Sequence, residues 1–403
     1  MKMDVGIVGA GPSGAWAAYC LARRGARVVL FDPSHPREKP CGGGVTGRAL
    51  ALVSDAVPSA ALSAAVIRRV VFTDSGRPVA AVALDGRPED PSAALVVASR
   101  TVFDGALLTA ALDAGATLVR ARVADVTVQA DGVSVATTAG AFRAPFLIGA
   151  DGANSLVRRR VTRPFGRDEL SVATGFFARG VTSEEIVIEM VADPPGYIWS
   201  FPRPDHLAVG ICTQADAGVS MDDLRKHTTR WIAESQIAGC ARLDAYSWPI
   251  PSLGADSLNR LTLAGPRWCL VGDAAGLVDS ITREGIYFAL LSGERAAEAL
   301  AGDARPSAYA ACIRSEIVPE LAIAARLKAG FFRPSFTSLL IRALIESPRI
   351  REVTADLLAG RQSYRGLKRR LLGTLEWTLA WRLLLSARNT RRAHGREAPS
   401  DRR

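Results

Sequence analysis

Residues 3–32 read MDVGIVGAGPSGAWAAYCLARRGARVVLFD, and this stretch decides the fold. It predicts an apolar strand, a glycine-rich turn, a helix and a second strand, which together form a βαβ unit. In the turn, Gly9 permits a tight bend, Gly11 lets a pyrophosphate approach the backbone, and Gly14 lets the helix pack closely on the strand. Asp32 follows Gly14 by 18 residues, where an acid can bind a ribose hydroxyl. The stretch therefore predicts a Rossmann-like dinucleotide-binding domain.

Two acidic motifs, Asp151-Gly152 and Gly272-Asp273, each follow a predicted buried strand. Together with the glycine-rich turn, in this order, they resemble the flavoprotein group folded like p-hydroxybenzoate hydroxylase. The resemblance implies that one FAD, rather than NAD, lies across the first domain, because an NAD-only dehydrogenase needs neither later motif. It implies that the pyrophosphate lies on the glycine-rich turn and the ribitol on Asp273. The FAD-binding residues implied are Gly9, Gly11, Ser13, Gly14, Asp32, Cys41, Gly42, Gly44, Arg100, Val123, Asp151, Asp273, Gly285 and Ile286.

Two further stretches narrow the resemblance to the geranylgeranyl reductase family. Residues 37–45, REKPCGGGV, resemble that family's loop into the flavin site, and residues 195–202, PGYIWSFP, match its YxWxFP signature. The resemblance implies FAD-dependent reduction of carbon–carbon double bonds in an isoprenoid (geranylgeranyl or polyprenyl) lipid, by hydride transfer from reduced flavin. The chain departs from the family at Ser280 and Arg283, where proline and glycine are usual. Arg283 brings a cation to the flavin pyrimidine edge or to an acidic group of the substrate.

Three aromatic residues, Tyr197, Trp199 and Phe201, alternate along a predicted strand, so their side chains share one face. Such a face is either an ordinary aromatic core layer or the wall of a tunnel for an apolar chain, and the resemblance favours the tunnel. Cys41 and Tyr197 are the candidate catalytic residues, as proton donors. The glycines after Cys41 allow a ligand to approach the backbone closely. The four dispersed histidines suggest no metal site.

The order of predicted elements gives an α/β chain that is α+β overall. A run of strands with one helix interrupts the first domain, which is typical of an inserted antiparallel sheet. We expect a discontinuous FAD-binding domain over 1–75, 94–164 and 262–305, a substrate sheet domain over 76–93 and 165–261, C-terminal helices over 306–392, and a disordered basic tail over 393–403.

Positive charge collects at the C-terminal end. The chain has 50 Lys and Arg against 40 Asp and Glu, and residues 361–403 alone contain twelve basic and three acidic residues. Because the remainder is nearly neutral, a general nucleic-acid-binding face is excluded, whereas a C-terminal contact with anionic lipid is plausible. Leucines and tryptophans between Leu371 and Leu385 lie among these charges. They either cover the protein's own core or lie on a membrane surface.

The six cysteines show no CxxC spacing, which favours reduced thiols over a disulfide framework. A strand predicted to start at Met3 leaves no room for a signal peptide, and no uncharged apolar run reaches the roughly 20 residues that span a bilayer. We therefore expect a cytoplasmic enzyme with peripheral contact to the inner face of the cell membrane. NADPH or another reductant supplies the electrons, and no second nucleotide fingerprint identifies it.

Two alternatives stay open at this stage. The first is an FAD-dependent monooxygenase, either a hydroxylase or epoxidase or a halogenase-like enzyme, built on the same domain. Halogenases need a catalytic lysine upstream of the aromatic motif, and only Lys2 and Lys39 precede Tyr197, which counts against halogenation. The second is a protein without enzymatic activity that carries flavin or lipid at a membrane.

Overall fold

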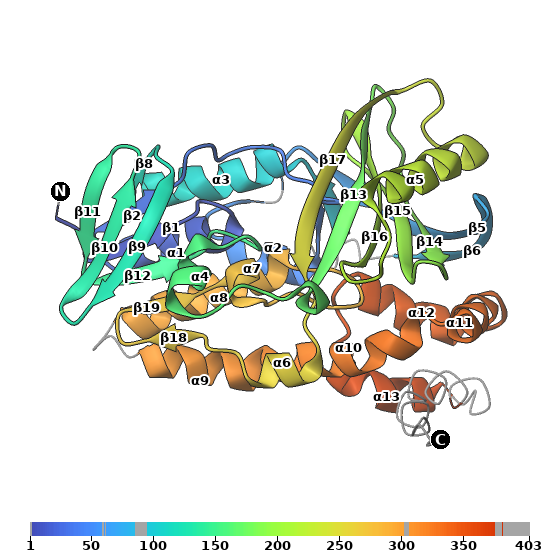
Figure 1. Cartoon of the computed structure of the whole chain (residues 1–403). Helices are drawn as coiled ribbons and strands as arrows, with labels where there is room; N and C mark the ends of the chain where they lie inside the picture. Colours follow the sequence, from blue (N-terminus) through green and yellow to red (C-terminus); the bar gives the residue numbers. More distant parts are fainter. Residues whose placement is uncertain are drawn as a thin grey trace, which may run out of the picture.

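The computed structural model describes residues 2–58, 60, 62–84, 95–301, 306–374 and 381. Its fold consists of two sheet-based units side by side, with a group of C-terminal helices beneath the second unit (Figure 1). This arrangement confirms the α/β class and the helical C-terminal region. The expected tail over 393–403 and most of the leucine and tryptophan stripe lie outside the described residues.

The first unit is built on a six-stranded sheet in the order β18-β19-β12-β1-β2-β8. The strands from β19 to β8 are parallel, and β18 is antiparallel to β19. Every residue of β1, β2 and β12 is buried, as a parallel sheet covered on both faces requires. The bounds are β1 Val5–Val8, β2 Val28–Phe31, β8 Thr117–Val119, β12 Phe146–Gly149, β18 Ala264–Gly265 and β19 Trp268–Leu270.

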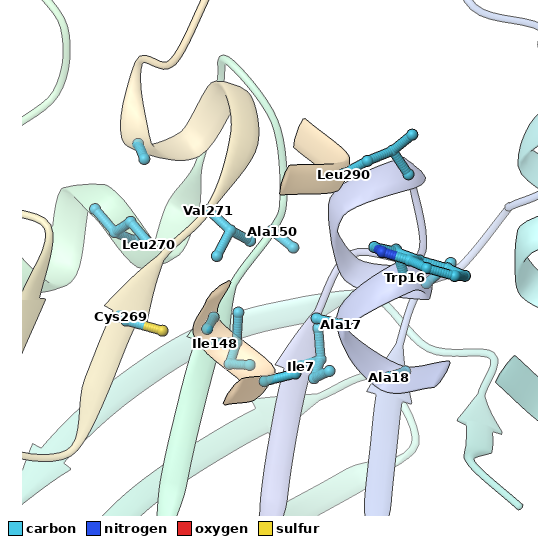
Figure 2. Close-up of a cluster of buried hydrophobic side chains, with 14 of the residues drawn as sticks. Ile7, Trp16, Ala17, Ala18, Ile148, Ala150, Cys269, Leu270, Val271 and Leu290 are labelled. Carbon is cyan, nitrogen blue, oxygen red and sulfur yellow. The ribbon is translucent and has the colours of Figure 1, made fainter. Parts of the chain in front are cut away.

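Helices α1 (Pro12–Ala22) and α8 (Ile286–Leu300) cross tightly over this sheet. A Cβ atom at Gly293 of α8 would lie 2.5 Å from the Ser13 carbonyl oxygen, so only glycine permits this approach. Figure 2 shows the packing beneath the helices, where Ile7 of β1 and Ile148 of β12 lie beside Ala17 of α1. The remaining elements of the unit are α2 Gly47–Val53, α3 Arg100–Asp113, α4 Leu156–Val161, α6 Ala255–Asn259, α7 Gly272–Ala275, α9 Pro306–Glu316 and the antiparallel strands β9 Val123–Gln129, β10 Gly132–Thr137 and β11 Gly140–Ala144.

The second unit is a seven-stranded sheet in the order β17-β13-β16-β15-β14-β5-β6, antiparallel except for the pair β14 and β5. Helix α5 (Met221–Ser235) packs against β13 and β16, and the short 3-10 helix η3 (Arg167–Glu169) leads into β13. The strand bounds are β5 Arg69–Asp74, β6 Arg77–Ala83, β13 Leu170–Arg179, β14 Glu185–Val191, β15 Gly196–Pro202, β16 His206–Gln214 and β17 Arg242–Pro251.

One expected boundary differs from the structure. We placed residues up to 75 in the first unit, but β5 is hydrogen bonded to β14 and β6 of the seven-stranded sheet. Two strands that precede β5, β3 Gly44–Val45 and β4 Ala64–Ile67, pair on either side of the later strand β7 Leu95–Ala98 in a small antiparallel sheet. The division into domains stays our prediction.

The C-terminal helices cover the β5 and β6 end of the seven-stranded sheet (Figure 1). Phe72 of β5 and Val82 of β6 share one buried cluster with Leu344 of α11 and Ile350 of α12. Within the described ranges, no helix is long and apolar enough to cross a bilayer. The bounds are α10 Val318–Phe331, α11 Pro334–Glu346, α12 Pro348–Leu358 and α13 Tyr364–Gly373.

Candidate active site

A cavity of about 390 Å³ is lined by residues of both sheet units and of the C-terminal helices. It brings together most of the residues that the sequence singled out. Those in its wall are Gly11, Ser13, Cys41, Gly42, Gly44, Arg100, Tyr197, Trp199, Phe201, Asp273, Gly285 and Ile286. The wall does not include Gly9, Gly14, Asp32, Val123 or Asp151.

The glycine-rich turn has the geometry that its spacing predicted. Gly9 has φ +101°, and a Cβ atom there would lie 2.4 Å from the Ala150 carbonyl oxygen. A Cβ atom at Gly14 would lie 2.0 Å from the Gly9 oxygen. At Gly11 the nearest atom to a Cβ would be His35 Nε2 at 3.6 Å, so the backbone there is not crowded. Gly9 and Gly14 therefore serve packing, while Gly11 leaves an open backbone at the start of α1.

Asp273, in α7, has a carboxylate that receives no hydrogen bond from any described residue. A Cβ atom at Gly285 would lie 3.3 Å from Asp273 Oδ1, so the carboxylate lies beside the start of α8. An acceptor without a donor fits a ribitol hydroxyl, and the N-terminus of α1 fits a pyrophosphate. The residues present therefore fit FAD.

Both carboxylate oxygens of Asp32 accept hydrogen bonds from groups of the protein itself. Its Oδ2 accepts from Ala10 N at 3.0 Å and His35 Nδ1 at 2.9 Å, and its Oδ1 accepts from Ser34 N at 2.9 Å and His35 N at 2.8 Å. These bonds, against the effect of burial, hold the pKa of Asp32 well below its usual range. Asp32 thus fixes the turn after β2, and its contact with ribose stays a prediction.

Asp151 caps a helix. Its Oδ2 accepts from Leu156 N at 2.6 Å and Val157 N at 3.1 Å in the first turn of α4, and its Oδ1 accepts from Ser155 Oγ. Burial raises the pKa of this carboxyl group above its ordinary value. Val123 is simply the first residue of β9. For both residues, contact with FAD stays a prediction.

Arg100 begins α3 with its charge paired. Its Nε and Nη2 donate to the two carboxylate oxygens of Asp104, at 2.8 Å each. Although burial lowers the pKa of Arg100, Asp104 raises it above the usual value. Arg100 lies in the cavity wall with Cys41, but it brings little free charge to a ligand.

A buried ion pair that the sequence did not reveal holds the loop over residues 37–45. Arg203 is fully buried, and its Nη1 donates to Glu38 while its Nη2 donates to the Cys41 carbonyl oxygen at 2.6 Å. Glu38 also accepts from Ser99 Oγ at the start of α3. Because Arg203 follows β15, the second unit positions the flavin loop of the first.

Two glycines of this loop pack against a side chain of the second unit. A Cβ atom at Gly42 would lie 2.9 Å from the Phe201 ring, and one at Gly44 would lie 3.1 Å from it. Gly43 has φ +86°, and its Cβ would lie 2.4 Å from the Ala98 oxygen. Phe201 of β15 packs on Gly42 and Gly44, which also line the cavity, and their contact with a ligand stays a prediction.

The two candidate proton donors differ. Tyr197 Oη donates to the Thr282 carbonyl oxygen at 2.8 Å, and burial raises the pKa of the phenol well above its usual value. Tyr197 is therefore a weak acid held in place. Cys41 Sγ accepts from Gly43 N at 3.3 Å and lies in the cavity wall.

The far part of the cavity is apolar. Side chains from β5 and β14 and from helices α10 to α13 line it, namely Phe72, Ile186, Ile188, Leu327, Phe331, Phe336, Leu340, Ile350, Val353, Leu357, Leu367 and Leu371. Tyr197, Trp199 and Phe201 all lie in the cavity wall, where Phe201 packs on the flavin loop and Tyr197 stacks on Phe332 after α10.

Comparisons with known proteins identify the family of the chain. A family described as FAD binding domain matches residues 2–301. The chain is 31% identical to the chloroplastic geranylgeranyl diphosphate reductase of Arabidopsis thaliana, over 74% of this chain and 66% of the plant protein. It is 31% identical to digeranylgeranylglycerophospholipid reductase of Methanothrix thermoacetophila, over 75% of this chain and 78% of the archaeal protein.

A solved structure has the same fold. The geranylgeranyl bacteriochlorophyll reductase-like protein of Thermoplasma acidophilum superimposes with a TM-score of 0.75, at 22% identity, over 92% of this chain and 99% of its own. Fold, site and family match define an FAD-dependent oxidoreductase. Within that class, the chain belongs to the geranylgeranyl reductase family.

Proposed function

We propose that the enzyme saturates carbon–carbon double bonds of an isoprenoid chain. The observation that carries this proposal is one continuous cavity, which runs from Asp273 and Gly285 to the apolar wall beneath the seven-stranded sheet. A long hydrocarbon matches that wall, because burial of each CH2 group contributes about 0.8 kcal/mol. The two relatives are named for molecules that share geranylgeranyl groups but differ in their polar part. The apolar chain is therefore the common feature of the substrate.

An isolated alkene is unactivated, so the protein's part is orientation and exclusion of water. When bound and reduced, FAD supplies the hydride. Trp199 is buried in the cavity wall and Phe201 is fixed against Gly42 and Gly44, so both give the chain a rigid surface. The carbon that does not receive the hydride needs a proton. We assign its delivery to Cys41 rather than Tyr197, because a phenol with a raised pKa is a weaker acid.

The test is an anaerobic half-reaction. The protein, with its FAD reduced by dithionite, is mixed with geranylgeraniol, and the fully saturated alcohol serves as control. We expect flavin reoxidation by the alkene only, with a product that gains two hydrogen atoms per bond. Cys41→Ala keeps FAD but slows this step. A product that has gained an oxygen atom in the presence of oxygen would identify a monooxygenase, and an unchanged alkene with and without oxygen would identify a carrier; both results overturn the proposal. Parallel reduction with NADPH and NADH identifies the electron donor.

We also propose that the enzyme works at the cytoplasmic face of an anionic membrane and takes its substrate from the bilayer. The support comes from α13, where Leu367 and Leu371 line the cavity while Lys368 and Arg369 are exposed. Trp381, further along the chain, has 51% of its surface exposed. Exposed basic residues and an exposed tryptophan suit an anionic lipid surface. One helix thus joins the cavity wall to a basic surface.

A further inference from the structure

Two cations, Arg283 and Lys328, meet at one buried serine. Arg283 Nη1 donates to Ser252 Oγ at 2.6 Å, and Lys328 Nζ lies 3.2 Å from both Ser252 Oγ and the Ser252 carbonyl oxygen. Lys328 also donates to Gln214 Oε1 at 3.2 Å. Among the residues that the structure describes, neither cation has a carboxylate within 4.0 Å. Burial, followed by the charge of Arg283, lowers the pKa of Lys328 to about 8.

The backbone at Arg283 adds a second unfavourable feature. Its φ is +61°, the left-handed region that favours glycine. Arg283 Nε is buried without a hydrogen-bond partner. A side chain that sits beside a like charge on a strained backbone, with no acid to neutralise it, lacks a negative partner. Within the described residues Arg283 donates to two neutral acceptors, Ser252 Oγ and the Ser280 carbonyl oxygen, so its charge is available to an anionic bound molecule.

The position of Arg283 identifies the molecule. It lines the same cavity as Asp273, and it lies two residues before Gly285, where α8 begins. The N-terminus of this 15-residue helix adds positive potential to the same wall. Tyr197, which also lines the cavity, donates to the Thr282 carbonyl oxygen and so holds the backbone next to Arg283.

We propose that Arg283, supported by Lys328, binds the negative charge of reduced FAD. Two electrons and one proton convert oxidised flavin to an anion whose charge lies on the pyrimidine ring, and a second proton gives the neutral reduced form. A cation beside that ring stabilises the anion against both other forms. It therefore raises the midpoint potential and lowers the pH at which the second proton binds. This inference rests on the FAD site and not on the isoprenoid substrate.

Arg283→Gly is the decisive variant, because its backbone conformation suits glycine and the fold is expected to survive. We expect sulfite, which adds to oxidised flavin to give an anion, to bind at least tenfold more weakly. The midpoint potential falls accordingly, by about 30 mV per tenfold change in a two-electron equilibrium. Arg283→Lys retains the charge and restores part of both values. The neutral reduced form, followed by absorbance, persists to higher pH in Arg283→Gly.

Lys328→Met tests the supporting cation. We expect a smaller fall in sulfite affinity at pH 6.5, and no difference from the wild-type protein well above pH 8, where Lys328 is neutral. The charged groups that act on Lys328 are Arg283, Asp216 and Asp168, so the measurement is repeated in the Arg283→Gly background. There the pKa of Lys328 rises, and its effect extends to higher pH.

Gln236→Gly is the matched control, since it relieves a φ of +54° at the end of α5 without removing a charge. We expect no change in potential or sulfite affinity. The proposal is overturned if Arg283→Gly keeps the wild-type values of both. It is also overturned if that variant loses only affinity for isoprenoid phosphate relative to the alcohol, because the anion then belongs to the substrate. None of these readouts uses isoprenoid turnover, so a failure of the proposed function is detected separately.

Discussion

Among single residues, Gly42 shows how closely the two sheet units meet at the flavin loop. A Cβ atom there would lie 2.9 Å from the Phe201 ring. We expect Gly42→Ala to lower the free energy of unfolding by about 1–3 kcal/mol through overpacking. Phe201→Leu in the same chain should restore part of it. Denaturant unfolding measures both, with Gly254→Ala as control, because nothing lies within 4 Å of a Cβ at Gly254. Equal stability of the two alanine variants would contradict this packing.

Asp273 offers the direct test of the cofactor site. We expect Asp273→Asn to raise the FAD dissociation constant by about 10–100-fold, because a hydrogen bond to a charged acceptor contributes about 1.5–3 kcal/mol. Titration of the apoprotein with FAD, followed by flavin fluorescence, gives the constant. Asp256→Asn, an exposed carboxylate on α6, is the control and should leave affinity unchanged. Unaltered affinity in Asp273→Asn would remove Asp273 from the site.

The residues that sequence reasoning found and missed differ in a physical way. Gly9 and Asp273 were found because each lies in a short local motif whose backbone geometry the neighbouring residues dictate. Glu38 and Arg203 were missed because they lie 165 residues apart and pair only after the two units assemble. Asp32 lies at the expected position in the motif, but its carboxylate oxygens accept hydrogen bonds from the turn that follows it, and residue spacing does not reveal these bonds.

Among the helices, α13 unites the cavity with the surface. Lys368 and Arg369 are exposed on it. We expect Lys368→Gln/Arg369→Gln to weaken binding to anionic vesicles, because each basic residue near such a surface contributes about 1 kcal/mol. Vesicle sedimentation at low and high salt measures the effect. Lys226→Gln/Arg230→Gln, which removes two exposed charges from α5, is the matched control. If both pairs behave alike, or FAD is lost as well, α13 does not face the membrane.

The pairing of strands is harder to predict from the sequence than the strands themselves. The sheet partners of β5 are β6 nearby and β14 more than a hundred residues later. The pattern of apolar residues indicates which side chains of a strand are buried, but strands with the same pattern can pair in many different orders. The sequence therefore does not reveal that β5 joins the seven-stranded sheet, and our division into domains stays a prediction.

At the scale of the whole molecule, the segment that connects α4 of the first unit to β13 of the second is held by Glu169. Arg163 donates to both of its carboxylate oxygens at 2.6 Å. These bonds, against the effect of burial, lower the pKa of Glu169 from 4.5 to about 2. The stability that this depressed pKa contributes is complete above pH 4.5 and is lost as the pH falls towards 2.

Glu169→Gln should therefore be less stable than wild type by about 1–2 kcal/mol at pH 7. The loss is smaller than the full pKa shift implies, because Arg163 is exposed and water screens part of the attraction between the two charges. The difference between the two proteins should shrink steadily below pH 4.5. Urea unfolding at pH 7, 4.5 and 3 measures it, with the exposed Glu234→Gln as control. A difference that is independent of pH would show that the ion pair is not its source.

The strand order β19-β12-β1 also sets a timetable for biosynthesis. A ribosome makes β1 first, yet β19 and Asp273 emerge only after the whole seven-stranded sheet. At about 5–20 residues per second, roughly 13–50 s separate β1 from β19. For roughly the last 6–24 s of that interval, after β12 has been made, the nascent chain carries an apolar β12 edge without its neighbour β19, and Asp273 has not yet been synthesised. We expect cofactor loading to follow release from the ribosome, and scarce riboflavin to leave a finished but empty protein rather than a stalled one.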